Sequence, residues 1–264
     1  MMLKDKLVWI TGASSGIGEA LALVCAGKGA NLILSARNEE KLQGVKEKCE
    51  AEGVKAHVFP MDLSEPESIK AVASKVLSEH PVIDILINNG GISQRSLTVE
   101  TVPEVDRRIM EINYFGTIAL TKEVLPVMQK QNRGGIIVIS SVVGKYGFPM
   151  RSAYSASKHA LHGFFDTLRA ELYNTGIDIT IVCPGRIRTN ISINALTLDG
   201  KIHGVMDPGQ DKGIRADVCA RKIIKGAMRK KREVYIGKGE VFLIYLRKYL
   251  PGLFFKIAAK ISPT

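Results

Sequence analysis

The stretch KLVWITGASSGIG, residues 6–18, decides the fold because an apolar run leads directly into closely spaced glycines. Residues 6–11 are typical of a buried strand, and the glycines fall where that strand should turn into a helix. Glycine lets backbone N–H groups approach a phosphate closely, and a helix N-terminus favours negative charge. The stretch predicts a dinucleotide-binding loop, with a tight turn that binds no ligand as the alternative. The loop residues concerned are Gly12, Ser14, Ser15, Gly16, Ile17 and Gly18.

The same alternation of strand and helix continues along the chain. Apolar, β-branched runs occupy residues 6–11, 30–36, 55–61, 84–89, 135–141, 177–183 and 233–237. Helical patterns lie between them, near 16–28, 39–52, 66–79, 103–131, 153–175 and 216–230. Such alternation predicts one α/β domain: a Rossmann-type, doubly wound parallel sheet of seven strands in three αβα layers. Residues 186–215 carry four glycines and are expected to form a loop beside the substrate.

The amino-acid composition limits the classes of protein to which this chain can belong. The 264 residues are 45% hydrophobic and 24% charged, which is ordinary for a globular domain. The four cysteines form no CxxC pair, so we expect neither a metal site nor a disulfide framework, and a reducing cytoplasm fits best. No signal peptide or membrane-spanning run is expected from the sequence.

The net charge of +11 is concentrated near the C-terminus. Residues 221–264 hold twelve Lys or Arg and two Glu, whereas residues 1–220 hold 25 basic and 24 acidic residues. A main body close to neutral argues against nucleic-acid binding. The chain is therefore divided into a catalytic domain, 1–239, and a basic amphipathic tail, 240–264.

This tail is expected to form two short helices, because Pro251 and Gly252 interrupt it. Lys256 and Lys260 share one edge of the second helix. Leu253, Phe254, Ile257 and Ile261 occupy another arc. The pattern fits a peripheral contact with anionic membranes, and it fits equally a tail that packs over the substrate entrance or builds a dimer contact.

The second strand ends in SARNEE, where an NAD site would usually carry an acidic residue for the ribose 2′-hydroxyl. Arg37 stands there instead, and a guanidinium matches a 2′-phosphate in charge and geometry. NADP(H) is the expected cofactor, with a solvated arginine as the alternative reading. Asp62 and Leu63 follow the third strand and either lie against the adenine or, for Asp62, cap the next helix.

The stretch SAYSASKHA, residues 152–160, places Tyr154 and Lys158 one helical turn apart with only small residues between them. A nearby ammonium is expected to lower the pKa of a phenol, which would let Tyr154 act as a general acid or base. Ser141, at the end of the fifth strand, offers a hydroxyl for the substrate oxygen. A surface ion pair and a strand-end serine are the inert alternatives.

Taken in order, TGASSGIG, Asp62-Leu63, NNGG (88–91), Ser141, Y-S-A-S-K (154–158) and Pro184-Gly185 resemble the short-chain dehydrogenase/reductase family over almost the whole chain. The stretches 189–207 and 250–260 look like the dehydrogenase/reductase member seven-B group. The family usually has NNAG where this chain has NNGG, and a glycine in place of that alanine is expected to change little beyond local flexibility.

The resemblance implies a catalytic set of Asn113, Ser141, Tyr154 and Lys158, with Asn113 holding a water that passes protons towards Lys158. It also implies that Lys158 holds the cofactor ribose, that Asn89 and Gly90 border the adenosine ribose, and that Pro184, Gly185, Ile187 and Thr189 line the nicotinamide end. It places substrate between residues 190–213 and a set of mostly apolar residues: Ser141, Val142, Val143, Tyr146, Phe148 and Met150.

These expectations combine into an NADP(H)-dependent carbonyl reductase, reversible as an alcohol dehydrogenase, that acts on a hydrophobic substrate. An NAD-preferring dehydrogenase and a non-enzymatic cofactor-binding protein on the same fold are the alternatives. The resemblance further implies a homodimer or homotetramer formed through residues 103–131 and 153–175.

Overall fold

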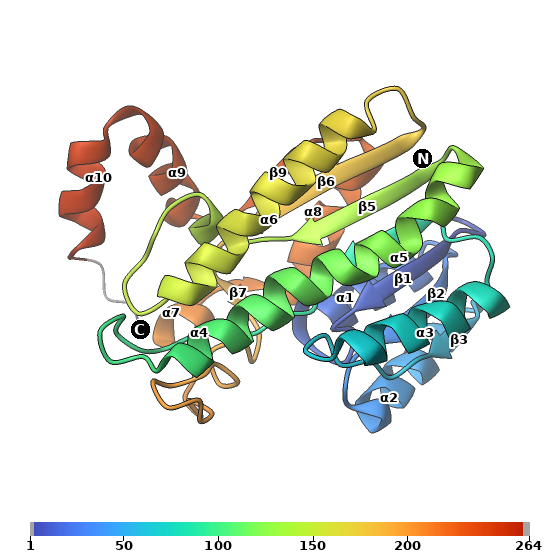
Figure 1. Ribbon diagram of the computed structural model, residues 1–264, viewed down its shortest axis with the longest axis horizontal. Coiled ribbons are helices and arrows are strands. Elements are labelled where there is room, and N and C mark those ends of the chain that lie inside the picture. Colours follow the sequence, from blue (N-terminus) through green and yellow to red (C-terminus); the bar gives the residue numbers. More distant parts are fainter. Residues whose placement is uncertain (1–2, 261–264) are drawn as a thin grey trace.

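A parallel sheet of seven strands forms the centre of the molecule (Figure 1). The computed structural model describes residues 3–260. The strands are β1 Leu7–Thr11, β2 Asn31–Ser35, β3 Ala56–Val58, β4 Ile85–Asn88, β5 Gly134–Ile139, β6 Ile177–Pro184 and β9 Glu233–Ile236. All seven predicted strands are confirmed, although the predicted run 55–61 shortens to three residues in β3.

The strand order is β3-β2-β1-β4-β5-β6-β9, and every pairing between neighbours is parallel. The chain first builds outward from β1 to β3 and then returns to add β4 on the other side of β1. Ligands of such sheets bind at this reversal, outside the carboxyl ends of the strands. The glycine loop after β1 and Asn89 after β4 therefore stand on the two sides of the expected crevice.

Helices cover both faces of the sheet and complete the three predicted layers (Figure 1). One face is packed by α1 Gly16–Ala26, α2 Glu39–Glu50 and α8 Ala216–Met228. The other is packed by α3 Pro66–Glu79, α5 Gly116–Gln131 and α6 Ser152–Glu171. Successive strand residues feed the two cores alternately, since Val8 and Ile10 join the first cluster and Trp9 joins the second. All three are fully buried, as expected for a sheet covered on both sides.

The helix predicted over residues 103–131 is interrupted. It consists of α4 Pro103–Met110, a π-helical turn η1 Glu111–Phe115, and α5. A π-turn inserts an extra residue into the helix and is frequent at functional sites. Hydrophobic spacing did not predict it, because one wider turn barely changes the apolar pattern. Asn113 lies in the middle of this turn.

Residues 186–215 form an ordered excursion rather than a plain loop. Two short strands, β7 Ile187–Arg188 and β8 Ile214–Arg215, pair in parallel, and α7 Pro208–Asp211 lies between them. The backbone of Leu196 bridges to Gln94 and to Ile202. The bridge to Gln94 joins the excursion to the segment that follows β4, and the bridge to Ile202 lies within the excursion.

Beyond β9 the chain forms α9 Gly239–Tyr249 and α10 Pro251–Ala258, which confirms the two predicted tail helices. Figure 1 shows them (red) at one end of the molecule. Leu246, Phe254 and Ala258 are buried in a cluster with Val142, Val143 and Tyr146, close to the short helix η2 Val142–Gly144. One face of the tail thus packs on the body. Ile261, included in the predicted apolar arc, lies outside the described residues.

Candidate active site

The glycine loop is built for close approach of a ligand to the backbone. Gly12 and Gly16 have φ angles of 63° and 60°, a region that residues with side chains seldom adopt. At Gly18 a Cβ would lie 2.1 Å from the carbonyl oxygen of Gly12, so only glycine fits there. Ser15 precedes α1 without capping it through its side chain. The first turn of α1 therefore offers N–H groups and a favourable dipole to an anion.

A cavity of about 1410 Å³ begins at this loop and extends to α9. Every predicted cofactor residue except Gly18 lines it: Gly12, Ser14, Ser15, Gly16, Ile17, Arg37, Asp62, Leu63, Asn89, Gly90, Tyr154, Lys158, Pro184, Gly185, Ile187 and Thr189. Gly18 instead lies behind the loop, against the backbone of Gly12 and the amide of Asn89. Asn89 braces the loop because its Nδ2 donates to the carbonyl oxygens of Thr11 and Gly12, at 3.0 and 3.2 Å.

Arg37 is exposed at the cavity wall, together with Lys41. Among the ion pairs of residues 3–260, none joins Arg37 to Glu39 or Glu40. Asn38, between Arg37 and Glu39, caps α2 by accepting a hydrogen bond from the Lys41 N–H at 2.8 Å. This end of the cavity therefore presents two cations that can meet a phosphate.

Asp62 also lines the cavity, and its local role differs from a helix cap. Its Oδ1 accepts hydrogen bonds from the N–H and the hydroxyl of Ser64, at 2.9 and 2.7 Å. Helix α3 begins later, at Pro66 after Glu65. Asp62 thus closes a tight turn of its own, of the kind Asp side chains favour, and this turn sets the direction of Leu63.

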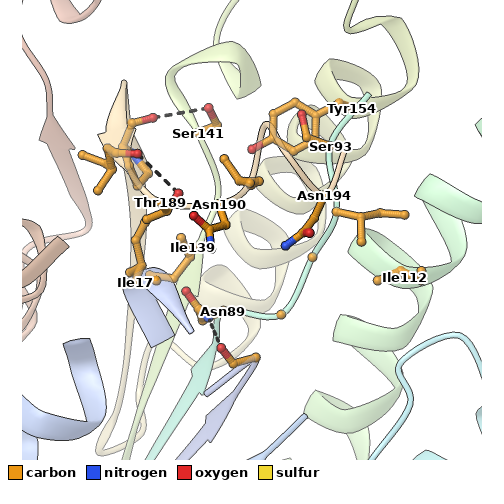
Figure 2. Close-up of a pocket in the computed structure, with 18 of the residues that line it drawn as sticks. Ile17, Asn89, Ser93, Ile112, Ile139, Ser141, Tyr154, Thr189, Asn190 and Asn194 are labelled. Carbon is orange, nitrogen blue, oxygen red and sulfur yellow. Dashed lines mark hydrogen bonds between the residues drawn. The ribbon is translucent and has the colours of Figure 1, made fainter. Parts of the chain in front are cut away.

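Tyr154 and Ser141 face the same space from two elements (Figure 2). Tyr154 comes from the first turn of α6, and Ser141 stands just before η2. The Ser141 hydroxyl donates to the carbonyl oxygen of Pro184 at 3.3 Å and accepts from the N–H of Val143 at 3.3 Å. In Figure 2 the phenol hydroxyl points towards Ser141, while Asn190 and Asn194 approach from the 186–215 excursion. A carbonyl oxygen placed between the two hydroxyls would meet two donors.

The pKa of Tyr154 reflects both its burial and the charged groups around it. Burial raises the pKa of Tyr154, and the opposing contributions come from a hydrogen bond with Ser141 and from the charges of Arg95 and Arg151. The Lys158 Nζ lies 5.8 Å from the centre of the phenol ring and donates to the carbonyl oxygen of Ile139 at 2.8 Å. Burial lowers the pKa of Lys158 to about 8. The charges that lower the pKa of Tyr154 here are those of Arg95 and Arg151, and a lowering by Lys158 stays a prediction.

Asn113 is fully buried and does not line the cavity. Its Oδ1 accepts from the N–H of Ile92 at 2.8 Å, and its Nδ2 donates to the carbonyl oxygen of Ile92 and to Ser157 Oγ, at 2.9 and 3.0 Å. The side chain thus joins the segment after β4 to the helix that carries Tyr154 and Lys158. The water-holding role of Asn113 stays a prediction.

Gly90 stands where the family motif has alanine, and a Cβ there would lie 2.5 Å from Leu63 Cδ1, at the end of a side chain. At the next glycine, Gly91, a Cβ would lie 2.9 Å from Asn113 Oδ1 and 3.6 Å from Lys158 Nζ. The 2.9 Å distance is shorter than ordinary carbon–oxygen contacts, so an alanine at Gly91 would displace the Asn113 amide. Glycine here allows Asn113 to sit directly against the backbone.

The substrate end agrees in part with the expected lining. Ser141, Val143, Tyr146 and Phe148 line the cavity, whereas Val142 and Met150 do not. Val142 instead packs against the tail helices. The other side is formed by the excursion, through Asn190, Ile191, Asn194, Leu196, Lys201, Ile202, Asp207, Gly209 and Gln210.

Sequence reasoning missed a buried charge cluster at this end. Asp207 Oδ2 accepts from Arg95 Nε and Nη2, at 2.9 and 2.6 Å, and from Arg151 Nη2 at 3.2 Å. Arg95 and Asp207 are 5% and 4% exposed, and all three residues line the cavity. No local signal reveals the cluster because Arg95 and Asp207 are 112 positions apart.

The tail also contributes to the cavity, through Gly239, Glu240 and Leu243. Glu240 Oε1 accepts from the N–H of Arg186 at 2.8 Å, and its carbonyl oxygen accepts from the Tyr146 hydroxyl at 3.2 Å. A Cβ at Gly185 would lie 2.4 Å from the Glu240 side chain, so the glycine after Pro184 is needed for this approach.

The glycine loop lies at the switch point of a parallel sheet, and the same cavity holds the phenol of Tyr154 and the hydroxyl of Ser141. This combination defines a nucleotide-dependent oxidoreductase. Residues 6–197 match the family model described as short chain dehydrogenase. The chain belongs to the short-chain dehydrogenase/reductase family.

Its relatives include the proteins that the sequence resemblance indicated. The chain is 43% identical over 264 residues to "Dehydrogenase/reductase SDR family member 7B" of Bos taurus, covering 97% of this chain and 81% of that protein. It is 44% identical over 263 residues to "Dehydrogenase/reductase SDR family protein 7-like" of Drosophila melanogaster, covering 98% and 81%.

Solved structures show the same fold. A short-chain dehydrogenase/reductase from Burkholderia phymatum in complex with NAD has a TM-score of 0.84 and 22% identity, covering 100% of this chain and 98% of that one. A short-chain dehydrogenase from Sphingobium yanoikuyae in complex with NADPH has a TM-score of 0.78 and 29% identity, covering 98% and 97%.

Proposed function

We propose that this chain is an NADP(H)-dependent carbonyl reductase, reversible as an alcohol dehydrogenase, for a substrate with a hydrophobic body. One observation carries the proposal: Tyr154, Ser141 and Lys158 line the same cavity as the glycine loop. A bound substrate would therefore meet a proton donor and a hydrogen-bond donor within reach of the cofactor.

The residues present fit a nicotinamide dinucleotide. The loop leaves no room for side chains at Gly12 and Gly18, where a Cβ would lie within 3 Å of the backbone, and α1 points its N-terminus at the cavity. We assign the pyrophosphate to this loop, the adenosine to Asp62, Leu63, Asn89 and Gly90, and the nicotinamide end to Pro184, Gly185, Ile187 and Thr189. The bound cofactor supplies or accepts a hydride.

The protein supplies the proton and the polar contacts. Reduction of a carbonyl leaves negative charge on its oxygen, which the Ser141 hydroxyl stabilises by donating a hydrogen bond. Tyr154 then donates its proton to that oxygen. Because burial raises the pKa of Tyr154, the phenol keeps its proton at neutral pH, which suits the reductive direction. We assign Lys158, which lines the same cavity, to the ribose hydroxyls of the cofactor.

The preference for NADP(H) is supported by charge at the adenosine end. Arg37 and Lys41 line this part of the cavity, and a 2′-phosphate would find both cations there. The hydrophobic substrate is supported by Val143, Tyr146, Phe148, Leu196 and Leu243 at the other end. The predicted homodimer or homotetramer and the cytoplasmic location stay predictions.

The proposal is tested with Tyr154→Phe, which removes the proton donor and keeps the ring. With NADPH and a panel of hydrophobic ketones, we expect the turnover number to fall by about 10²- to 10⁴-fold while the dissociation constant for NADPH stays within a few-fold of the wild type. Tyr173→Phe, at an exposed tyrosine after α6, is the matched control and should leave both values unchanged.

Unchanged turnover in Tyr154→Phe would show that another group donates the proton. Wild-type protein that binds NADPH and reduces no compound of the panel would favour the non-enzymatic alternative. A ratio of kcat/KM that favours NADH over NADPH would favour the NAD-preferring alternative.

A further inference from the structure

The tail helices α9 and α10 have a second face that the body does not cover. Their inner face is buried through Leu246, Phe254 and Ala258, and the Phe254 ring lies 5.3 Å from that of Tyr146. On the outer face, Phe242 and Tyr249 are 63% and 67% exposed. The two helices therefore pack on the body of the protein with one side and expose aromatic side chains to solvent on the other.

Exposed apolar side chains are concentrated in this pair. The described chain has sixteen exposed large apolar side chains, and seven of them fall between residues 242 and 257. They are Phe242, Tyr245, Tyr249, Leu250, Leu253, Phe255 and Ile257. Exposed apolar side chains gathered on one short segment indicate an interaction site, whereas scattered single residues do not. We call these seven residues the outer patch.

Positive charge borders the outer patch. Arg247, Lys248, Lys256 and Lys260 are all exposed, and residues 241–264 contain no Asp or Glu. The Arg247 guanidinium lies 5.1 Å from the centre of the Phe255 ring, and Lys248 Nζ lies 5.2 Å from that of Tyr249. These cations thus stand beside the aromatic side chains rather than on an opposite face.

Aromatic rings next to Lys and Arg match the boundary between lipid headgroups and acyl chains. Aromatic residues settle at that level, and basic residues beside them attract anionic lipids by about 1 kcal/mol each. A second copy of this chain suits the patch less well, because it would bring two equally basic surfaces together. Charge complementarity therefore selects an anionic surface.

We propose that the outer patch and its four cations dock this protein onto the surface of an anionic lipid bilayer. Helix α9 has 11 residues and rises about 16 Å, roughly half of the hydrocarbon thickness of a bilayer. Docking therefore takes the form of two short helices lying at the headgroup level. In residues 3–260 no helix is long and apolar enough to span a membrane.

Docking would bring the lipid surface next to the cavity. Leu243 lines the cavity, and its neighbour Phe242 belongs to the outer patch, so α9 contributes side chains to both. On the proposed function, a hydrophobic carbonyl compound dissolved in the bilayer would reach the cavity over a short path. Vesicle binding itself is independent of that function and is measured without substrate.

The test is flotation of the full chain with phosphatidylcholine vesicles that contain or lack phosphatidylserine. Deleting the tail would be uninformative, because Glu240 and Leu243 form part of the cavity. Two double variants are used instead: Phe242→Ser with Tyr249→Ser for the apolar part, and Lys248→Glu with Lys256→Glu for the charge. The four residues are exposed and do not line the cavity, so turnover should be unchanged.

We expect the wild type to bind vesicles with phosphatidylserine, with affinity that falls as salt is raised. Each double variant should weaken binding about tenfold or more. Matched controls change equivalent groups elsewhere: Val99→Ser with Tyr173→Ser, and Lys70→Glu with Lys130→Glu, all at exposed positions. These should bind as the wild type does.

Three results would overturn the proposal. The wild type could fail to bind anionic vesicles, or both tail variants could bind as tightly as the wild type. The tail variants could also change the mass of the protein measured by light scattering while vesicle binding stays the same, which would make the patch an interface between copies. The charge variant keeps the test decisive if the apolar variant misfolds.

Discussion

The two ends of the cavity are built in different ways. At the cofactor end, the lining residues come from the short segments that follow β1, β2, β3 and β4, so the order of the sheet brings them together. At the substrate end, Arg95, Arg151, Asp207 and Glu240 come from four separate segments and meet only in the folded protein. The comparison shows that binding a common cofactor needs local backbone geometry, whereas shaping a substrate site needs long-range side-chain contacts.

The forces at the two ends differ as well. The glycine loop works through N–H groups and a helix dipole, which cost little to arrange once α1 forms. At the substrate end, the guanidinium groups of Arg95 and Arg151 surround the carboxylate of Asp207. Much of the attraction between these charges only offsets the free energy lost when they leave water. Losing one partner is therefore far more damaging there.

The largest effect is expected from Asp207→Ala, which leaves the buried guanidinium of Arg95 without its carboxylate partner. We expect the free energy of unfolding to fall by about 3–5 kcal/mol, measured by urea denaturation. Asp199→Ala is the matched control in the same excursion, because Asp199 pairs with Lys201 at the surface, and it should leave the midpoint unchanged. Equal effects of the two changes would show that burial does not distinguish these ion pairs.

Lys158 lines the same cavity, and its titration predicts how the stability of the protein depends on pH. Its pKa in the folded protein is about 8, below the ordinary value of 10.5. Between these pH values the unfolded chain binds a proton at Lys158 that the folded protein has released, so this residue makes stability rise with pH across that window. Below pH 8 both states are protonated and the contribution is constant.

The rise is measured as the difference in free energy of unfolding between the wild type and Lys158→Met, without cofactor. From pH 8 to 10.5 that difference should increase by on the order of 3 kcal/mol. Subtracting the two free energies removes the contributions of the cysteines and tyrosines that titrate in the same range. Lys248→Met, at an exposed lysine, should give a flat difference, and a flat curve for Lys158→Met would contradict the prediction.

The smallest effect is expected at the cofactor end. Arg37→Met removes one of the two exposed cations from the cavity wall. We expect the dissociation constant for NADPH to rise about 10- to 100-fold, or roughly 1.4–2.7 kcal/mol, with that for NADH nearly unchanged. Isothermal titration measures both, and Arg229→Met serves as a control at an exposed arginine after α8. An equal loss for both cofactors would place Arg37 at some group other than the 2′-phosphate.

What could be predicted from the sequence follows the same division. The seven strands and their helices were predictable because buried strands and amphipathic helices leave periodic patterns. The glycine loop, Tyr154 and Ser141 were predictable because their chemistry depends on short spacings. The π-turn at Asn113 was not, since α4 and the turn itself pack against α6, which is distant in the sequence. The Arg95–Asp207–Arg151 cluster was not either, because no spacing in the chain connects its members.

The hydrogen bond from the Arg186 N–H to Glu240 has a consequence for biosynthesis. Residues 239–243 are translated after all the other residues that line the cavity, and they close its wall beside Gly185. The β1–α1 cradle also depends on later segments, because β1 pairs with β4 and α1 packs against α8. During synthesis the wall of the cavity is therefore completed only after residues 239–243 have left the exit tunnel.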